Sequence, residues 1–125
     1  MQKKPQPPFS IRARKQSFEY AFEGISSFFR SEPNAVIHLL ITAAVIVLAI
    51  VLKVSVGEGA ILTLAIGIVW VAELFNTAIE AIMDHLSPER HPAVKRIKDI
   101  SSAAVLIAAM SAVIVGLIIF IPKFI

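Results

Sequence analysis

Three long apolar stretches constrain this chain more than any other feature of its sequence. They cover residues 35–54, 60–86 and 99–121, and polar segments separate them. Each is long enough to cross the roughly 30 Å hydrocarbon core of a bilayer as an α-helix. Only 17% of the residues are charged, against about 25% in soluble domains. We therefore expect an all-α integral membrane protein with three transmembrane helices.

The segment before the first span predicts a helix of another kind, over residues 9–30. Large apolar side chains recur there at helical spacing: Phe18, Phe22, Ile25 and Phe29. Such an amphipathic helix suits the membrane interface, and it would equally suit packing on the rest of the protein. For residues 1–8, which hold three prolines, we predict a disordered tail and no cleavable signal. We expect one membrane domain over 9–125.

The distribution of Lys and Arg predicts the orientation. Of the 12, six precede the first span and four lie in the loop over 87–98, whereas the other side has only Lys53 and Lys123. Lys and Arg collect on the cytoplasmic side of membrane proteins. We therefore expect a multi-pass membrane protein with a cytoplasmic N-terminus and an external C-terminus. This topology also accounts for the net charge of +3, and we expect no nucleic-acid partner.

The second span carries polar residues on one face. Glu73, Glu80 and Asp84 lie within about 40° of one another on a helical wheel, flanked by Asn76 and Thr77. Ionisable residues near the bilayer centre cost roughly 2.5–3.5 kcal/mol each on insertion scales, and they usually face a bundle interior or a water-filled site. Glu73 is the deepest, since Glu80 is ~10 Å closer to the cytoplasmic end. A carboxylate at this depth predicts a functional site.

The predicted topology brings more polar residues to the same membrane face. Glu32 precedes the first span, and Lys98, Asp99 and Ser102 open the third. Carboxylates grouped in this way repel one another unless a cation joins them. Ligands that are all oxygen favour Mg²⁺. The sequence therefore predicts a cation-binding site at this face.

Several of these residues also have a purely structural interpretation. Asn76 could join neighbouring helices, as polar residues in membrane bundles do. Asp84 and Asp99 could be solvated helix ends, and Glu32 could interact with a helix dipole. His38, near the start of the first span, we interpret as a packed polar residue rather than a metal ligand.

Two short motifs carry a more specific signal. Residues 72–84 read AELFNTAIEAIMD, which fits the pattern E-x-x-N-S/T-A-I-E-x-x-x-D, and residues 98–106 read KDISSAAVL. In type and spacing, both motifs resemble those of the prokaryotic diacylglycerol kinase family, and the likeness covers about residues 11–122. One position departs from it, because the family often has an arginine where this chain has Ala13.

The resemblance implies a homotrimeric helical bundle that acts as an ATP-dependent kinase of diacylglycerol or undecaprenol. Glu73 would be the general base on the lipid hydroxyl, Glu32 and Glu80 would hold Mg²⁺, and Asp84 would support them. By the same resemblance Ser102 would join Glu73 at the lipid substrate. The implied ATP-binding residues are Tyr20, Glu32, Asn76, Glu80, Glu89, Arg90, His91, Lys98 and Asp99.

Two other hypotheses stay open from the residues alone. Glu73 could be the relay carboxylate of a small ion- or proton-coupled transporter. The polar face could also do no more than join helices in a non-catalytic assembly subunit. The chain contains neither a G-x-x-x-x-G-K-S/T loop nor a G-x-G-x-x-G loop, so the expectation of ATP depends on the family resemblance.

Overall fold

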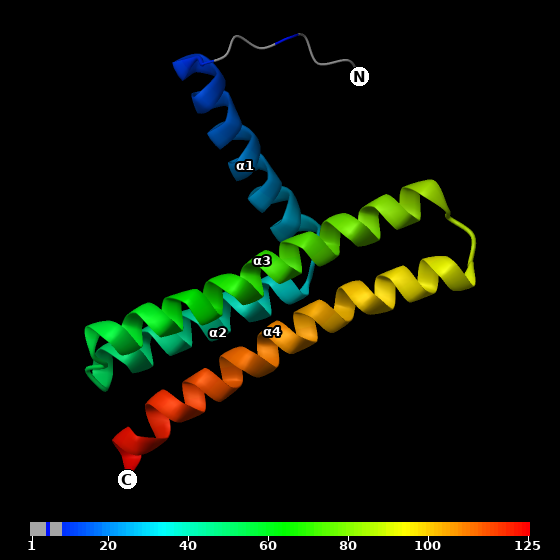
Figure 1. The fold of residues 1–125 in the computed structure, drawn as a ribbon. Helices are drawn as coiled ribbons and strands as arrows, with labels where there is room; N and C mark the ends of the chain where they lie inside the picture. Colours follow the sequence, from blue (N-terminus) through cyan, green and yellow to red (C-terminus); the bar gives the residue numbers. More distant parts are fainter. Residues whose placement is uncertain (1–4, 6–8) are drawn as a thin grey trace. The chain divides into compact units, whose positions relative to one another are not determined.

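The computed structural model describes residues 5 and 9–125 and consists of helices and short connections. Four helices follow one another along the described chain: α1 (Ile11–Ser31), α2 (Asn34–Val51), α3 (Val56–Leu86) and α4 (Pro92–Phe124) (Figure 1). They belong to two compact units, residues 1–36 and 37–125. Apart from Pro5, the tail predicted over residues 1–8 lies outside the described residues.

In the first unit, α1 begins two residues later than predicted because Ser10 caps it. The Ser10 side chain accepts a hydrogen bond from the backbone N–H of Ala13 at 3.3 Å. The helix ends where Glu32 turns to an extended conformation, and the Glu32 N–H donates to the carbonyl of Phe28 at 2.9 Å. The amphipathic helix predicted for this segment therefore forms.

In the second unit, α2 ends at Val51, earlier than the predicted residue 54. Lys53 has a φ of 53°, in the left-handed region. Its N–H donates to the carbonyl of Ile50, and the N–H of Val54 donates to that of Ala49. These two bonds are those of a Schellman motif, which satisfies the last carbonyls of a helix. Lys53 occupies the position where glycine is usual.

Helix α3 begins at Val56, not at the predicted residue 60. The Ser55 side chain accepts a hydrogen bond from the N–H of Glu58 at 3.1 Å. Ser followed three residues later by Glu is the sequence of a capping box, and Glu58 also lies in the first turn, where the helix dipole favours an acid. Because of this cap, Gly57 and Gly59 lie inside the helix rather than before it.

Helix α4 begins at Pro92, so the polar connector covers residues 87–91 and the predicted loop through Lys98 is wrong. Nδ1 of His91 accepts a hydrogen bond from the N–H of Ala93 at 3.0 Å, and Pro92 is in the first turn. Proline suits this position because its missing N–H would have no helical partner. The helix continues to Phe124, with Pro122 in its last turn rather than beyond its end.

Helices α3 and α4 run antiparallel and side by side (Figure 1). Near the α2–α3 connector, α2 joins them in an apolar cluster. Its buried members are Leu62, Ile119 and Phe120, packed against Val45, Leu48, Ala49, Leu52, Val54 and Val115.

The predicted all-α fold is confirmed, and so is the presence of three helices that could cross a membrane. Helices α2, α3 and α4 are long and apolar enough to cross a membrane. No more than 17% of the most apolar window of each is buried within the chain, so most of its apolar surface is open to lipid or to other chains. Exposed apolar surface of this kind costs nothing in hydrocarbon, which is as apolar as the side chains.

Candidate functional site

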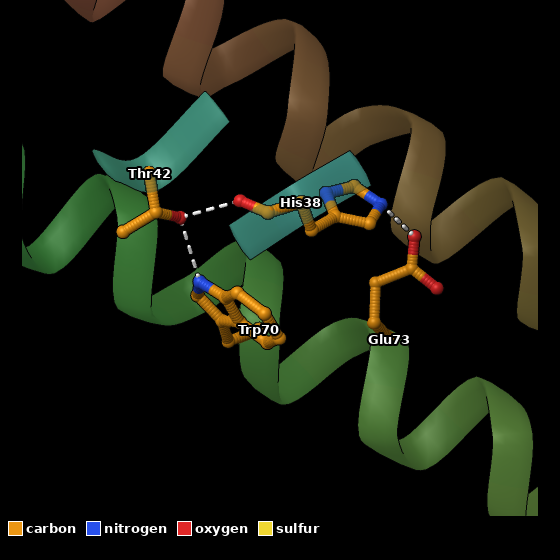
Figure 2. A network of polar contacts seen from close by, with 4 residues as sticks. All are labelled: His38, Thr42, Trp70 and Glu73. Carbon is orange, nitrogen blue, oxygen red and sulfur yellow. Dashed lines mark hydrogen bonds and ion pairs between the residues drawn. The ribbon is translucent and has the colours of Figure 1, made fainter. Parts of the chain in front are cut away.

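Glu73 lies midway along α3, and its carboxylate meets a side chain from α2. Its Oε1 is 2.6 Å from Nε2 of His38 (Figure 2). The two side chains are only 12% and 23% exposed, respectively. Ionisable groups within membrane helices usually pair with one another. Glu73 therefore points at another helix of its own bundle rather than outward.

A second contact joins the same two helices beside this pair. Nε1 of Trp70 donates to Oγ1 of Thr42 at 3.0 Å, and Thr42 Oγ1 donates in turn to the backbone carbonyl of His38 at 2.8 Å (Figure 2). The Trp70 and His38 rings meet edge to face, with centroids 6.1 Å apart. His38 is thus the packed polar residue that its sequence position suggested, and this network holds both its ring and its backbone.

About one turn beyond Glu73, α3 is joined to α4 by a short side-chain hydrogen bond. Oγ of Ser101 donates to Oδ1 of Asn76 at 2.7 Å. Ser101 is 7% exposed, whereas its neighbour Ser102 is exposed. The helix-joining role considered for Asn76 is therefore present, and Ser101 provides its partner.

The connector between α3 and α4 forms the wall of a cavity of about 610 Å³. Two ion pairs border it: Lys98 with Asp84, and Lys95 with Asp99 at 2.6 Å. Six of the predicted site residues line it: Asp84, Glu89, Arg90, His91, Lys98 and Asp99. The structure thus gathers the predicted polar connector and both helix ends around one cavity.

The lining of the cavity carries charged side chains of both signs. The first turn of α4, where the helix dipole favours negative charge, forms one side of it. Lys95 and Lys98 lie in its lining, each paired with a carboxylate. Among the residues that the structure describes, Arg90 has no ion-pair partner and so remains available for a phosphate.

The remaining predicted residues are divided between the two units. Glu80 is half-buried on α3 and forms no ion pair within the described chain. Tyr20 is exposed on α1, and Glu32 is the C-cap of that helix. Both belong to the unit of residues 1–36.

Carboxylate oxygens are ligands suited to Mg²⁺, but within the described residues no group of three or more His, Cys, Asp or Glu side chains gathers to hold a metal ion. Nucleotide sites usually bind Mg²⁺ through one or two carboxylates, with phosphates and water completing the shell. A single carboxylate such as that of Glu80 therefore has the donor chemistry for a metal that arrives with a nucleotide.

A model of the prokaryotic diacylglycerol kinase family matches residues 19–120. The chain belongs to this family. Its similar proteins include an undecaprenol kinase of Bacillus subtilis (strain 168), 37% identical over 108 residues that make up 86% of this chain and 88% of the relative. A diacylglycerol kinase of Synechocystis sp. is 38% identical over 107 residues, 85% of this chain and 61% of the relative. The diacylglycerol kinase of Escherichia coli (strain K12) is 41% identical over 69 residues, 55% of this chain and 57% of the relative.

This member of the prokaryotic diacylglycerol kinase family is therefore an enzyme of lipid metabolism, a phosphotransferase, and a membrane protein. Because the chain belongs to a kinase family, the transporter hypothesis is not favoured. Sequence reasoning found Glu73 but missed the contact that His38 makes with it, and it missed Ser101.

Proposed function

We propose that this chain is an ATP-dependent lipid kinase whose acceptor is the hydroxyl of diacylglycerol or undecaprenol, giving phosphatidic acid or undecaprenyl phosphate. The lipid oxygen forms a bond to the γ-phosphorus, the bond from that phosphorus to the bridging oxygen breaks, and ADP leaves. The proton of the lipid hydroxyl passes to the carboxylate of Glu73. Family membership and the names of the relatives support this reaction class.

The observation that carries the proposal is a mostly buried carboxylate, that of Glu73, on an apolar helix. Glu73 lies about 16 Å along α3 from Asp84, which borders the cavity at the α3–α4 connector. A lipid hydroxyl lies at the boundary between acyl chains and headgroups, whereas ATP comes from water. A carboxylate at acyl-chain depth suits the lipid hydroxyl, and a charged cavity at the helix ends suits ATP.

The nucleotide site in this proposal centres on the cavity at the α3–α4 connector. Arg90 and Lys98 neutralise phosphate charge there, because phosphoryl transfer depends mainly on alignment and charge stabilisation. Glu89, His91, Asp99 and, from α1, Tyr20 also contact the nucleotide. Asn76, farther along α3, contacts the phosphates, and Asp84 supports Lys98 through their ion pair.

Glu80 and Glu32 are the proposed ligands of Mg²⁺ bound with ATP. When bound, the metal would neutralise the phosphate oxygens. The half-buried Glu80 carboxylate, which is unpaired within the described residues, supports its part in this proposal. Ser102, exposed on α4, is the proposed contact to the lipid headgroup.

The proposed assembly is a homotrimer with α1 in the membrane interface, a cytoplasmic N-terminus and one membrane domain over 9–125. The exposed apolar surface of the three spans and the resemblance support it. Because the chain has no cysteine, single cysteines can report topology. In spheroplasts, an impermeant maleimide should label Lys53→Cys and spare Gln16→Cys. Light scattering of the detergent-solubilised protein should give three times the mass of one chain.

Transfer of radiolabelled γ-phosphate to each lipid in mixed micelles tests the function. We expect transfer to at least one of the two acceptors, and loss of nearly all of it in Glu73→Gln. Glu58→Gln, in the first turn of the same helix, is the matched control and should keep its activity. Absence of transfer to both lipids would end the kinase proposal. Full activity of Glu73→Gln would end the role of Glu73 as the base.

A further inference from the structure

The contact between His38 and Glu73 uses only one of the two carboxylate oxygens. Nε2 of His38 lies 2.6 Å from Oε1, and no hydrogen bond or ion pair within the described residues engages Oε2 (Figure 2). A general base needs a free lone pair aimed at the proton that it accepts. A histidine that holds Oε1 leaves Oε2 for this purpose and limits rotation of the carboxylate.

The His38 side chain is itself held from two sides. The Trp70 ring meets it edge to face, and the hydrogen bonds from Trp70 to Thr42 and from Thr42 to the His38 carbonyl hold the turn of α2 that carries it. Trp70 also precedes Glu73 by three residues on α3, so one turn of that helix supplies both groups. An orienting residue must be held by its own neighbours if it is to hold another.

The position of the pair adds to this argument. His38 and Glu73 come from different helices, and both side chains are mostly buried in an apolar bundle. A carboxylate in such surroundings is costly unless a partner compensates it. Imidazole is such a partner, and unlike Lys it can also be neutral. Stabilising the buried acid and aiming it are two distinct roles, and they predict different mutant behaviour.

We infer that His38 is a positioning residue for the proposed base Glu73: its Nε2 holds Oε1, so that Oε2 faces the hydroxyl of the lipid. This role presupposes the proposed role of Glu73. It adds a residue from α2 to the catalytic machinery, outside both motifs of the family resemblance.

Four variants test the inference in the full-length protein, with diacylglycerol and undecaprenol as acceptors in mixed micelles. His38→Leu removes the contact. His38→Gln places an amide nitrogen near the position of Nε2, and His38→Asn places it nearer to that of Nδ1, too short to reach Glu73. His85→Gln, at an exposed histidine of α3, is the matched control. Thermal stability and oligomeric state are measured for every variant.

We expect kcat to fall about 100-fold in His38→Leu, since misplacement of a reacting group by about 1 Å has an effect of this size. The KM for ATP should not change. The kcat of His38→Gln should be about 10-fold higher than that of His38→Leu. His38→Asn should gain less, because only the longer amide reaches Oε1 of Glu73. His85→Gln should behave as wild type.

A purely structural role for His38 gives another pattern. Leucine suits a membrane helix, so His38→Leu would then keep its kcat, and the two amides would be equivalent. Either result, or a loss that appears only as a raised KM for ATP, overturns the positioning role. An active wild type, an inactive Glu73→Gln and normal His38 variants would refute this inference alone. An active Glu73→Gln would instead refute the proposed base.

Discussion

Replacement of Ser101 by alanine is the sharpest test of how α3 and α4 are joined. Ser101 is 7% exposed and donates to Oδ1 of Asn76 at 2.7 Å, a short distance for a neutral pair. Ser101→Ala removes the donor and leaves the amide oxygen of Asn76 without it. The change removes one polar atom and no apolar contact, so the hydrogen bond should account for nearly all of the effect.

Its magnitude follows from the membrane setting. In water, a buried acceptor that loses its partner costs about 1–3 kcal/mol. Interhelical hydrogen bonds in a membrane protein average about 0.6 kcal/mol and reach about 1.7 kcal/mol, because the unfolded chain in the membrane also finds partners. The short distance and the burial place Ser101 in the upper half of this range. We expect a loss of about 1–1.7 kcal/mol, a factor of about 5–20 in the unfolding equilibrium constant.

Equilibrium unfolding in mixed micelles with increasing SDS measures this loss. Ser111→Ala is the matched control, because Ser111 lies on the same helix and its hydroxyl donates to the backbone carbonyl of Ile107, within that helix. In an Asn76→Leu background, Ser101→Ala should cost almost nothing, since the acceptor is already absent. Two results would refute the assignment of this hydrogen bond as the link between the helices. One is that Ser101→Ala costs the same free energy of unfolding in the wild-type and Asn76→Leu backgrounds. The other is that Ser101→Ala costs no more than Ser111→Ala.

Three further predictions concern the two ends of the bundle. Arg90→Gln and Lys98→Met should each raise the KM for ATP about 10-fold, with a smaller change in kcat. Initial rates over a range of ATP concentrations measure both constants. A change confined to the KM for lipid would contradict the nucleotide site. Chelation by EDTA should stop phosphate transfer and added Mg²⁺ should restore it, whereas transfer that survives chelation would exclude the metal site. Lys123→Met should lower the free energy of unfolding by about 1 kcal/mol, because it leaves Glu58 without its partner at 3.0 Å. Kinase activity should not change. A drop in kcat without loss of stability would contradict this purely structural role.

Much of the site could be predicted from sequence because it lies on a single helix. Glu73, Glu80 and Asp84 share one face of α3 through helical periodicity alone, and any helix over these residues would align them. The helix starts were predicted less well. Glu58 in a capping box and Pro92 at a first helical position were signals that the polarity of both connectors obscured.

The partners across helices could not be predicted in the same way. Ser101 and Ser102 are neighbours in sequence, yet only Ser101 faces Asn76. The choice depends on the rotation of α4 against α3, and a shift of one residue turns a side chain by about 100°. The contact of His38 with Glu73 depends on the relative depth of α2 and α3 in the same way.

The amino-acid sequence alone was enough to predict three helices long and apolar enough to cross a membrane, and to place the acids on the second of them, α3. The match between an apolar stretch and the bilayer, like helical periodicity, is a property of each segment by itself. The packing of the helices was needed to show that Glu73 meets His38, that Asn76 meets Ser101 and that the α3–α4 connector lines a cavity. Those contacts join residues far apart in the chain, and they follow from how the helices pack, which no single segment specifies.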